Sequence, residues 1–395
     1  MRALEGITVV AVEQAVAAPL ATRHLADLGA RVIKVERVDG GDFAREYDHA
    51  VKGSGAHFVW LNRSKESIAV DLSRAEGRRV VEKLVDSADV FLQNLAPGAA
   101  DRLGFASAAL RASRPRLVTV DMSGYGSGGP YAQKKAYDML VQSEAGLIAM
   151  TGTPETPSKT GVAAADIAAG LYAFSGVLAA LVRRGRTGEG GHVEVSMFDA
   201  IVEWMGYPLY TAMYTGEAPP RSGLGHAAIV PYDAYPTLGG GRLLIGVQND
   251  RGWVALTRDV LKRPELAEDS RYATNVARVA RRAEVDALVG EVTRTMHAAE
   301  LAGRLDAAGI PNAALNEVEH VAEHPQLEAR DRWREVGSPG GPIRAVLPPI
   351  GLDGEEARMD PIPALGVHTD AILRELSYSP EAIAELRASG VIGGS

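Results

Sequence analysis

The stretch Gly161–Arg186 has the sequence GVAAADIAAGLYAFSGVLAALVRRGR, which sets one acid, Asp166, into an otherwise apolar run. Between Val162 and Val182 no other charged side chain occurs. The run has about 21 residues, so a helix of this length would cross a bilayer core and make Asp166 an intramembrane functional residue. Its composition is mostly Ala and Gly with few Leu, Ile or Phe, which favours a buried helix in a soluble core.

The two ends of this predicted helix carry opposite charges. Asp166 lies near the N-terminal end, and Arg183, Arg184 and Arg186 precede a Gly-rich turn at the C-terminal end, as the helix dipole favours. Small residues predict the close approach of another backbone at positions 169, 170, 175 and 176. Asp166 either caps the helix or takes part in chemistry, and its position alone favours the structural interpretation.

Composition limits the classes of protein to which the chain can belong. Its 395 residues predict two domains, and its net charge of -8, with no long basic run, argues against nucleic acid or an anionic membrane as a partner. Because the chain has no cysteine, it has no disulfide, thiolate nucleophile or thiolate metal site, and we expect no metal site. The N-terminal MRALEGITVVAVE lacks the pattern of a signal peptide, which predicts the cytoplasm.

The first part of the chain alternates strand-like and helix-like segments, as a parallel α/β sheet requires. Helical spacing occurs at Pro19–Leu28 and Ala75–Ser87. The strand-like segments are Ile7–Val12, Arg31–Glu36, Ser67–Leu72, Asp89–Leu92 and Leu117–Asp121. This pattern predicts an α/β fold with a Rossmann-like layer.

A glycine motif follows the last of these strands. Residues Gly124–Gly129 (GYGSGG) satisfy the spacing G-x-G-x-x-G. We interpret them as a turn, because Pro130 follows, no helix opens on the glycines, and the strand is not the first of the sheet. The sequence therefore does not predict a dinucleotide site here.

The second half contains the remaining predicted elements. They are a strand at Gly191–Met197, a helix at Phe198–Tyr214, a linker at Glu217–Gly225, a hairpin at Tyr232–Val247, three helices between Gly252 and His324, a second connection at Gly337–Pro349, and helices at His368–Leu376 and Pro380–Ser389. We expect the last two helices to return to the first domain. No internal repeat is present.

Several stretches, taken in order, resemble the class III CoA-transferases, a family related to the α-methylacyl-CoA racemases. The matching stretches are LEGITVVAVEQAVAAP, LGARVIKVER, LNRSKESIAVDLS, DVFLQNLAPGAADRLGF, SGYGSGGP, AYDMLVQ, TGEGGHVEVSMFDA and LGVHTDAIL. Their order and spacing cover nearly the whole chain. The resemblance implies an enzyme with no permanently bound cofactor, whose substrates are coenzyme A thioesters and small carboxylic acids.

The resemblance changes the interpretation of Asp166. That acid matches the family's nucleophilic aspartate, which implies that it is catalytic. Its carboxylate would attack the donor thioester to give a mixed anhydride, and the released thiolate would convert the anhydride into an aspartyl-CoA thioester. An apolar, water-poor surrounding would protect the anhydride from hydrolysis.

The resemblance also implies which residues contact CoA. Three of the cations, Arg37, Arg102 and Lys135, would neutralise its phosphates. The full set of implied contacts is Val16, Ala17, Arg37, Leu61, Lys65, Asn94, Leu95, Arg102, Leu103, Lys135 and Tyr137. Gln14 lies where relatives often carry another polar residue, and we assign it to the substrate.

One position separates the transferases from the racemases. The racemases carry His followed by Asp where this chain has Tyr137 and Asp138. An ordinary tyrosine has a pKa of about 10 and is a poor base at neutral pH, so the pair argues against a racemase or epimerase. A catalytically inactive CoA-binding relative, with Asp166 only capping its helix, stays a third alternative.

A glycine-containing segment, Arg221–His226, resembles the substrate loop of transferases that act on small acids. Gly223 and Gly225 would allow close approach of the acceptor, and Arg221 with His226 would pair its second carboxylate. The same segment is equally compatible with a linker. The substrate-loop interpretation predicts a dicarboxylate such as succinate, mesaconate or malate, with succinyl-CoA as donor, and leaves oxalate and longer acyl groups open.

The family fold implies an α/β Rossmann-like large domain, a smaller α+β domain and a homodimer of interlocked rings. We expect the large domain to begin with residues 1–215, the small domain with its linkers to span 216–335, and residues 336–395 to return to the large domain. Composition alone does not predict interlocking.

Overall fold

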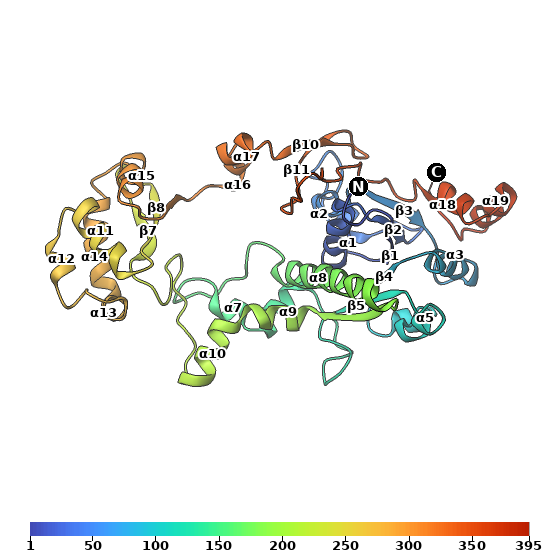
Figure 1. The fold of residues 1–395 in the computed structure, drawn as a ribbon, viewed down its shortest axis with the longest axis horizontal. Helices are drawn as coiled ribbons and strands as arrows, with labels where there is room; N and C mark the ends of the chain where they lie inside the picture. The colour runs from blue at the N-terminus through green and yellow to red at the C-terminus, as the bar shows by residue number, and fades with distance from the viewer. Residues whose placement is uncertain (395) are drawn as a thin grey trace. The chain divides into compact units, whose positions relative to one another are not determined.

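The computed structural model describes residues 1–394 and divides the chain into two compact units. The first unit comprises Met1–Leu147, Lys159–Tyr207 and Ala329–Ser395, and the second comprises Ile148–Ser158 and Pro208–Glu328. Figure 1 shows the elements of both units.

Six parallel strands form the central sheet of the first unit, in the order β3-β2-β1-β4-β5-β6. This is the strand order of the classical dinucleotide-binding fold, and the order reverses direction between β1 and β4. The strands are β1 (Thr8–Val12), β2 (Arg31–Glu36), β3 (Lys65–Ala69), β4 (Val90–Gln93), β5 (Val118–Ser123) and β6 (Gly191–Ser196). The predicted α/β class is confirmed, although β3 begins two residues before the segment predicted for it.

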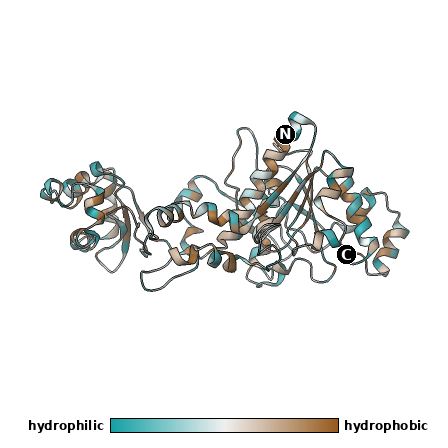
Figure 2. Cartoon of the chain, turned by 90° about the horizontal axis from the view of Figure 1, so that it is seen from below, coloured by the Kyte–Doolittle hydropathy of each residue, from teal (hydrophilic) through white to brown (hydrophobic). Residues whose placement is uncertain are grey.

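Buried hydrophobic residues attach helices to this sheet. Val10 of β1 pairs with Ile33 and Phe91 in the neighbouring strands, and all three side chains are buried. Helix α3 (Ala75–Asp86) contributes Val80, Val81, Leu84 and Val85 to the same core. Figure 2 shows the hydrophobic residues gathered on the strands and on the helix faces that meet them. Each fully buried aliphatic side chain contributes about 1.5–3 kcal/mol to this packing.

Helix α8 (Ala164–Thr187) is the element predicted from the apolar run, and it packs along α1 (Ala17–Asp27). A Cβ atom on Gly170 would lie 2.7 Å from the carbonyl oxygen of Ala17, so the predicted close approach is confirmed there. By length and composition alone, α8 would suffice to cross a membrane. One face of α8 is buried, whereas Leu171, Tyr172 and Val182 are exposed, so the helix is only partly the buried core helix that we predicted.

Between β5 and α10 (Gly206–Thr215), the predicted glycine turn is confirmed and the predicted single helix is wrong. No helix opens on Gly124–Gly129, because after β5 the next helix is α6 (Asp138–Glu144), which confirms the turn. The single helix predicted at Phe198–Tyr214 is wrong, because α9 (Met197–Trp204) ends before α10 begins. Pro208 lacks the N–H group that would continue the α9 hydrogen-bond ladder.

The C-terminal segment adds a hairpin and two helices to the first unit. β10 (Trp333–Val336) pairs with β11 (Ile343–Val346), so the connection predicted at Gly337–Pro349 contains a strand. α18 (Thr369–Glu375) packs on β3, and residues of α18 and α19 (Pro380–Ala388) join the core of the sheet. The other short helices of the first unit are η1 (Phe43–Glu46), α2 (Ala56–Leu61), α4 (Ala99–Arg102) and α5 (Ser107–Ser113).

The second unit is an α+β structure with its own core around Trp253. The predicted hairpin is confirmed as β7 (Tyr232–Pro236) and β8 (Arg242–Gly246), and β9 (Asn312–Ala314) extends it. We predicted three helices before His324, but the structure has two long helices, α14 (Arg282–Thr293) and α15 (Ala298–Ala307), and several short ones. The short elements are α7 (Leu147–Met150), α11 (Asp250–Ala255), η2 (Leu256–Val260), α12 (Glu265–Glu268), α13 (Asn275–Val279), α16 (Val318–Val321) and α17 (Pro325–Ala329).

Candidate active site

The switch point of the sheet brings the loops after β1 and β4 together. The side chain of Asn94 donates to the carbonyl oxygen of Gln14 at 2.9 Å and accepts from the N–H of Gln14 at 3.0 Å. Open α/β sheets bind their ligands at this position, outside the carboxyl ends of the strands. Two of the predicted substrate and CoA residues are therefore in direct contact at the usual binding place of the fold.

The start of α8 carries Asp166 in its first turn, but another carboxylate caps the helix. Asp138 accepts hydrogen bonds through Oδ1 from the N–H groups of Ala165 at 2.8 Å and Asp166 at 3.2 Å. Its Oδ2 accepts from the amide of Gln142 at 2.6 Å. Because Asp138 satisfies these helix donors, the side chain of Asp166 is not needed as a cap.

The carboxylate of Asp166 is largely buried, and neither a cation nor a hydrogen-bond donor in the described residues offsets its negative charge. Among residues 1–394, no hydrogen-bond donor or cation lies within bonding distance of it. Burial raises its pKa to about 7, and the negative charge of Asp138 adds to the rise. A carboxyl group near half ionisation at neutral pH, in an apolar surrounding, suits a nucleophile or a proton carrier.

Helix α1 meets α8 beside Asp166. Ala15 from the β1–α1 loop packs in one hydrophobic cluster with Ala163 and Ile167, which flank Asp166 in the chain. Val16 and Leu20 form the buried centre of that cluster. The loop that carries Gln14 is therefore in the immediate surroundings of the start of α8.

Tyr47 is a residue of this region that the sequence analysis missed. Burial raises the pKa of its hydroxyl to about 12, and the nearby charges of Asp42 and Asp166 contribute, so the hydroxyl stays protonated. Its ring packs edge-on against the His57 ring at 5.7 Å. Tyr137, which we predicted to contact CoA, is two-thirds exposed. No pattern in the sequence marked Tyr47, since it follows a short η1 turn rather than a strand.

Lys65 and Leu61 are predicted CoA contacts whose side chains do not reach the surface. Leu61 is fully buried in the cluster around Val16, and Lys65 is buried with its Nζ bonded to Glu13 at 2.7 Å. Lys65 also donates to Asn62 and to the carbonyl oxygen of Pro19. Its charge is therefore compensated inside the protein, which argues against a direct ion pair between Lys65 and a phosphate.

Three other predicted cations are exposed. Arg37 donates to the carbonyl oxygen of Gly41 at 3.2 Å. Within the described part of the chain, Arg37, Arg102 and Lys135 form no ion pair with a carboxylate, so their charges are available to an anion. Of the remaining predicted contacts, Val16 and Ala17 are buried at the start of α1, while Leu95 and Leu103 are half-buried.

Arg221, which we predicted to pair a substrate carboxylate, bonds backbone carbonyl groups of the second unit. Its guanidinium donates to the carbonyl oxygens of Thr153 at 2.8 Å, Ala149 at 3.0 Å and Pro154 at 2.8 Å. These three bonds use three of the five N–H donors of the guanidinium. The arginine fastens the middle of the predicted linker to residues 149–154.

The two glycines of this segment have different surroundings. A Cβ atom on Gly223 would meet no atom within 4 Å, and the residue has a φ of +61°, which favours glycine. At Gly225 a Cβ atom would lie 2.8 Å from Asp233. The exposed ring of His226 stacks on Tyr232 at 5.4 Å, and its Nδ1 accepts from the N–H of Ala228. No group of three or more His, Asp or Glu residues suited to a metal ion occurs in residues 1–394.

Comparisons with known proteins identify the family of the chain and agree with its fold. The family model described as CoA-transferase family III matches residues 4–369. The chain is 34% identical to the succinate–glutarate CoA-transferase of Agrobacterium fabrum, over 94% of this chain and 95% of that protein. It is 31% identical to the succinyl-CoA:glutarate CoA-transferase of Homo sapiens, over 99% of this chain and 90% of that protein.

A solved structure shows the same fold over nearly the whole chain. The crystal structure of a CAIB/BAIF family protein from Brucella suis superposes with a TM-score of 0.82 at 35% identity, over 95% of this chain and 99% of that chain. Together with the family match, this likeness confirms the resemblance that the sequence motifs indicated. The chain therefore belongs to CoA-transferase family III, and it is an enzyme whose substrates are CoA thioesters.

Proposed function

We propose that the enzyme transfers CoA from succinyl-CoA to a small dicarboxylic acid through a thioester on Asp166. The observation that carries this proposal is the uncompensated carboxylate of Asp166 in the first turn of α8, where Asp138 already caps the helix. A carboxylate that only capped the helix would accept the N–H bonds that Asp138 accepts. The proposal therefore favours a nucleophile over an inactive CoA-binding relative.

The reaction begins when an Asp166 oxygen attacks the thioester carbonyl of the donor. The C–S bond breaks, the electron pair leaves with the CoA thiolate, and Asp166 becomes part of a mixed anhydride. The thiolate then attacks the Asp166 carbonyl of the anhydride, so the donor acid leaves as a carboxylate and an aspartyl-CoA thioester remains. The acceptor carboxylate repeats the two steps in reverse order and takes the CoA. No proton or redox equivalent is consumed.

The burial of Asp166 and the exposed cations of the first unit support this chemistry. Burial removes water from the carboxylate, which makes the ionised form more basic and protects the anhydride from hydrolysis. The exposed cations Arg37, Arg102 and Lys135 are the proposed partners of the CoA phosphates. Val16, Ala17, Asn94, Leu95, Leu103 and Tyr137 remain proposed contacts of CoA, and Leu61 and Lys65 would act through their backbone or by supporting the loop.

The choice of substrates rests on the named relatives and on a predicted loop. Both transferases named above have succinate or succinyl-CoA and glutarate in their names, which supports a dicarboxylate acceptor and a succinyl donor here. Gln14, Gly223, Gly225 and His226 remain proposed contacts of the acceptor, and for Arg221, whose guanidinium already bonds three carbonyl oxygens, we propose a structural role.

The racemase alternative finds less support at Tyr137 and Asp138. Racemisation needs an acid and a base on either side of the α-carbon. The Asp138 carboxylate bonds Ala165, Asp166 and Gln142, so it is committed to helix capping rather than free to exchange protons. A test of the proposed function must therefore also measure exchange of the α-proton, the activity that a racemase would have.

Intact-mass spectrometry after incubation with succinyl-CoA alone tests the proposal. We expect a covalent CoA adduct that hydroxylamine converts to a hydroxamate at Asp166, and no adduct with Asp166→Ala. If no adduct forms with several acyl-CoAs while deuterium enters the acyl α-carbon from heavy water, the racemase replaces the transferase mechanism.

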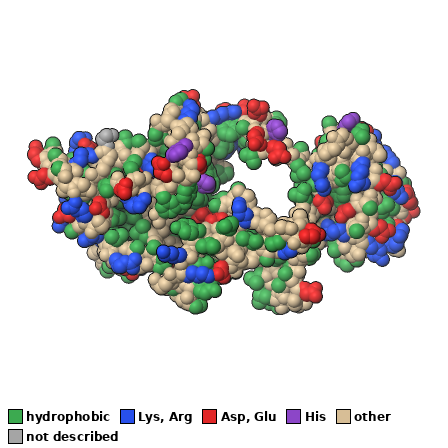
Figure 3. All heavy atoms as spheres, turned by 180° about the vertical axis from the view of Figure 1, so that it is seen from behind, with side chains coloured by type: hydrophobic (Ala, Val, Ile, Leu, Met, Phe, Trp, Pro, Cys, Tyr) green, Lys and Arg blue, Asp and Glu red, His purple; other side chains and the backbone are tan. Residues whose placement is uncertain are grey.

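We also propose that the enzyme is a homodimer of interlocked rings in the cytoplasm, with the domain division 1–215, 216–335 and 336–395. Exposed aromatic and aliphatic side chains support an interface, among them Leu171 and Tyr172 of α8 and Tyr210 and Tyr214 of α10. Figure 3 shows that hydrophobic side chains reach the surface over much of one face. Light scattering coupled to gel filtration should give twice the mass of the chain, and a monomer mass would contradict the proposal.

A further inference from the structure

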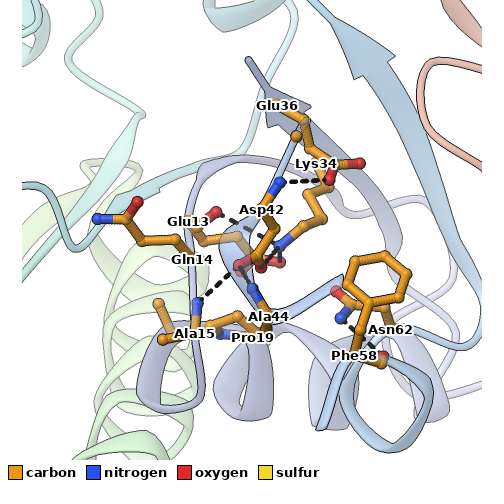
Figure 4. Close-up of polar contacts among 12 residues, drawn as sticks. Glu13, Gln14, Ala15, Pro19, Lys34, Glu36, Asp42, Ala44, Phe58 and Asn62 are labelled. Carbon is orange, nitrogen blue, oxygen red and sulfur yellow. Dashed lines mark hydrogen bonds and ion pairs between the residues drawn. The ribbon is translucent and has the colours of Figure 1, made fainter. Parts of the chain in front are cut away.

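A buried cluster of charged side chains lies beneath the loop that follows β1. Lys34, in the middle of β2, is fully buried, and its Nζ lies 2.8 Å from Asp42 Oδ2 and 3.4 Å from Glu13 Oε1. Lys65 Nζ lies 2.7 Å from the same Glu13 oxygen. Figure 4 shows the side chains of Lys34, Asp42 and Glu13 meeting next to Gln14 and Ala15. Two cations and two carboxylates thus neutralise one another inside the first unit.

Asp42 connects this charged cluster to the backbone of the loop. Its Oδ1 accepts hydrogen bonds from the N–H of Ala15 at 3.0 Å and of Ala44 at 2.9 Å, while Oδ2 faces Lys34. The N–H of Asp42 itself donates to Glu36 Oε1 at 3.0 Å, which Arg45 also holds. Every polar atom of the Asp42 carboxylate is therefore bonded, and the carboxylate has little freedom to move.

The backbone that Asp42 holds is in an unfavourable conformation. Ala15 has a φ of +63°, a left-handed conformation that costs a residue with a Cβ atom about 1–3 kcal/mol. The hydrogen bond that the Ala15 N–H donates to Asp42 and the two bonds between Gln14 and Asn94 maintain it. The left-handed turn therefore depends on two side chains that belong to other parts of the sheet.

This turn determines the direction of the Gln14 side chain. In Figure 4 Gln14 points away from the charged cluster, whereas Ala15 lies against Asp42. Among residues 1–394, no hydrogen-bond partner of the Gln14 side-chain amide is present, and Ala15 packs in the cluster that contains Ala163 and Ile167 on either side of Asp166. The Gln14 amide therefore has unused donors and an unused acceptor, and it follows Glu13 and precedes Ala15 in a loop that packs on the residues flanking Asp166.

We propose that Asp42 is a positioning residue for CoA transfer, because its carboxylate holds the left-handed Gln14–Ala15 turn and so aims the Gln14 amide at the acyl group on Asp166. This inference rests on the proposed function of Asp166. Asp42 touches no substrate and acts only through the backbone of Ala15. Lys34 has the separate task of neutralising Asp42 in the interior.

A matched pair of double variants separates the hydrogen bond of Asp42 from its charge. Asp42→Asn with Lys34→Met removes both charges but keeps a side-chain oxygen that accepts from the Ala15 N–H. Asp42→Ala with Lys34→Met removes the same two charges and the acceptor as well. The two variants have identical net charge, and in both Glu13 keeps its partner Lys65.

The readouts are kcat and KM for transfer from succinyl-CoA to glutarate, the Kd for CoA, and the fraction of aspartyl-CoA lost to water. We expect the Ala variant to lose kcat by about 10–100-fold and to hydrolyse more of its intermediate, because a small misplacement of a substrate-facing group has effects of that size. The Asn variant should restore kcat to within about threefold of the Lys34→Met background. The Kd for CoA should stay the same in both.

Equal kcat values in the two double variants would overturn the inference, and so would a loss of kcat that follows only the fall in melting temperature. The mass experiment on the unmodified enzyme keeps the two proposals apart. If that enzyme forms no adduct at Asp166, the proposed function itself fails. If it forms the adduct and both double variants form it at the same rate, only the role of Asp42 is wrong.

Discussion

Buried carboxylates in the first unit occur in two opposite electrostatic surroundings, one around Glu13 and Asp42 and the other around Asp166. Burial by itself would raise the pKa of Glu13, but Lys65 and Lys34 hold it below its usual value. In the same way, Lys34 lowers the pKa of Asp42, although burial would raise it. Within residues 1–394 Asp166 has no such partner, and burial with the nearby Asp138 raises its pKa to about 7. Compensation distinguishes a structural acid from a reactive one, since both kinds are buried.

The two sets also differ in what they hold. Glu13 and Asp42 are saturated with hydrogen bonds and fix the loop after β1, whereas the Asp166 carboxylate is free to bond a substrate. A buried carboxylate with a full set of hydrogen bonds contributes to folding. A buried carboxylate without them lowers the stability of the fold and is typical of functional sites. Each prediction below perturbs one side of this contrast.

The largest effect is expected from removing the reactive acid. Asp166→Ala should lower kcat by about 10⁴-fold or more, because no other carboxylate at the start of α8 is free to attack the thioester. The melting temperature should not fall, since the variant removes an uncompensated acid. The measurement is chromatographic assay of CoA transfer from succinyl-CoA to glutarate. Transfer within tenfold of the unmodified enzyme would assign the nucleophile elsewhere.

Removing a cation from the compensated set should destabilise the fold. Lys34→Met leaves Asp42 buried without a partner, and breaking a buried pair in this way costs about 3–5 kcal/mol of unfolding free energy. Urea unfolding followed by circular dichroism measures the loss. Lys83→Met, on the exposed side of α3, is the control and should change the unfolding free energy by less than about 1 kcal/mol. A similar small change for Lys34→Met would mean that the cluster does not depend on its charges.

Arg221 tests whether a cation that is already bonded acts in recognition. Arg221→Lys removes the guanidinium fork that bonds Thr153, Ala149 and Pro154, and we expect the unfolding free energy of the second unit to fall by about 1.5–3 kcal/mol. The KM for the dicarboxylate should stay the same. A KM that rises without a loss of stability would return Arg221 to the substrate site.

The smallest predicted effect concerns the pH dependence of the reaction. Only ionised Asp166 attacks a thioester, so kcat/KM should rise with pH through about 7 and level off above it. Asp138→Asn removes the neighbouring negative charge while an amide oxygen still accepts from Ala165, so this rise should move to lower pH. Glu144→Gln, at the other end of α6, is the control and should leave the profile unmoved. An unshifted profile in Asp138→Asn would show that burial alone raises the pKa.

The stability of the fold should also depend on the ionisation of Asp166, but it should fall with rising pH where kcat/KM rises. The pKa of Asp166 is higher in the folded state than in the unfolded chain, so its protonated form favours folding, and stability is lost as pH rises from about 4 to about 7. Asp166→Asn lacks this loss. Its melting temperature should therefore exceed that of the unmodified enzyme by a margin that grows through that window and is constant above it.

Much of the fold was predictable from local patterns. Alternating apolar strands and amphipathic helices indicated the parallel sheet, because β-branched runs and 3.6-residue spacing are properties of short segments. The break between α9 and α10 was missed although Pro208 stands in the sequence, since apolar spacing continued across it. The strand β11 was missed because neighbouring prolines and glycines hid a short hairpin.

Some residues of the candidate site were likewise predictable from the sequence, and others were not. An acid alone in an apolar run marked Asp166, and a lysine inside the apolar strand Arg31–Glu36 was a signal for the buried cluster that we did not use. The partners of these residues come from far along the chain, such as Asp138 for the start of α8 and Asn94 for Gln14. Tyr47 and the occupied donors of Arg221 had no signal of their own.

The sequence by itself determined the alternating strands and helices of the first half, the absence of thiol chemistry and, through its ordered motifs, membership in the family. Only the tertiary structure decided which charged groups are compensated. It assigned helix capping to Asp138, left Asp166 without a partner, and bonded Lys65 and Arg221 internally. The physical reason is that the pKa of a side chain depends on its burial and on charges within a few ångströms, and those charges come from segments that only folding brings together.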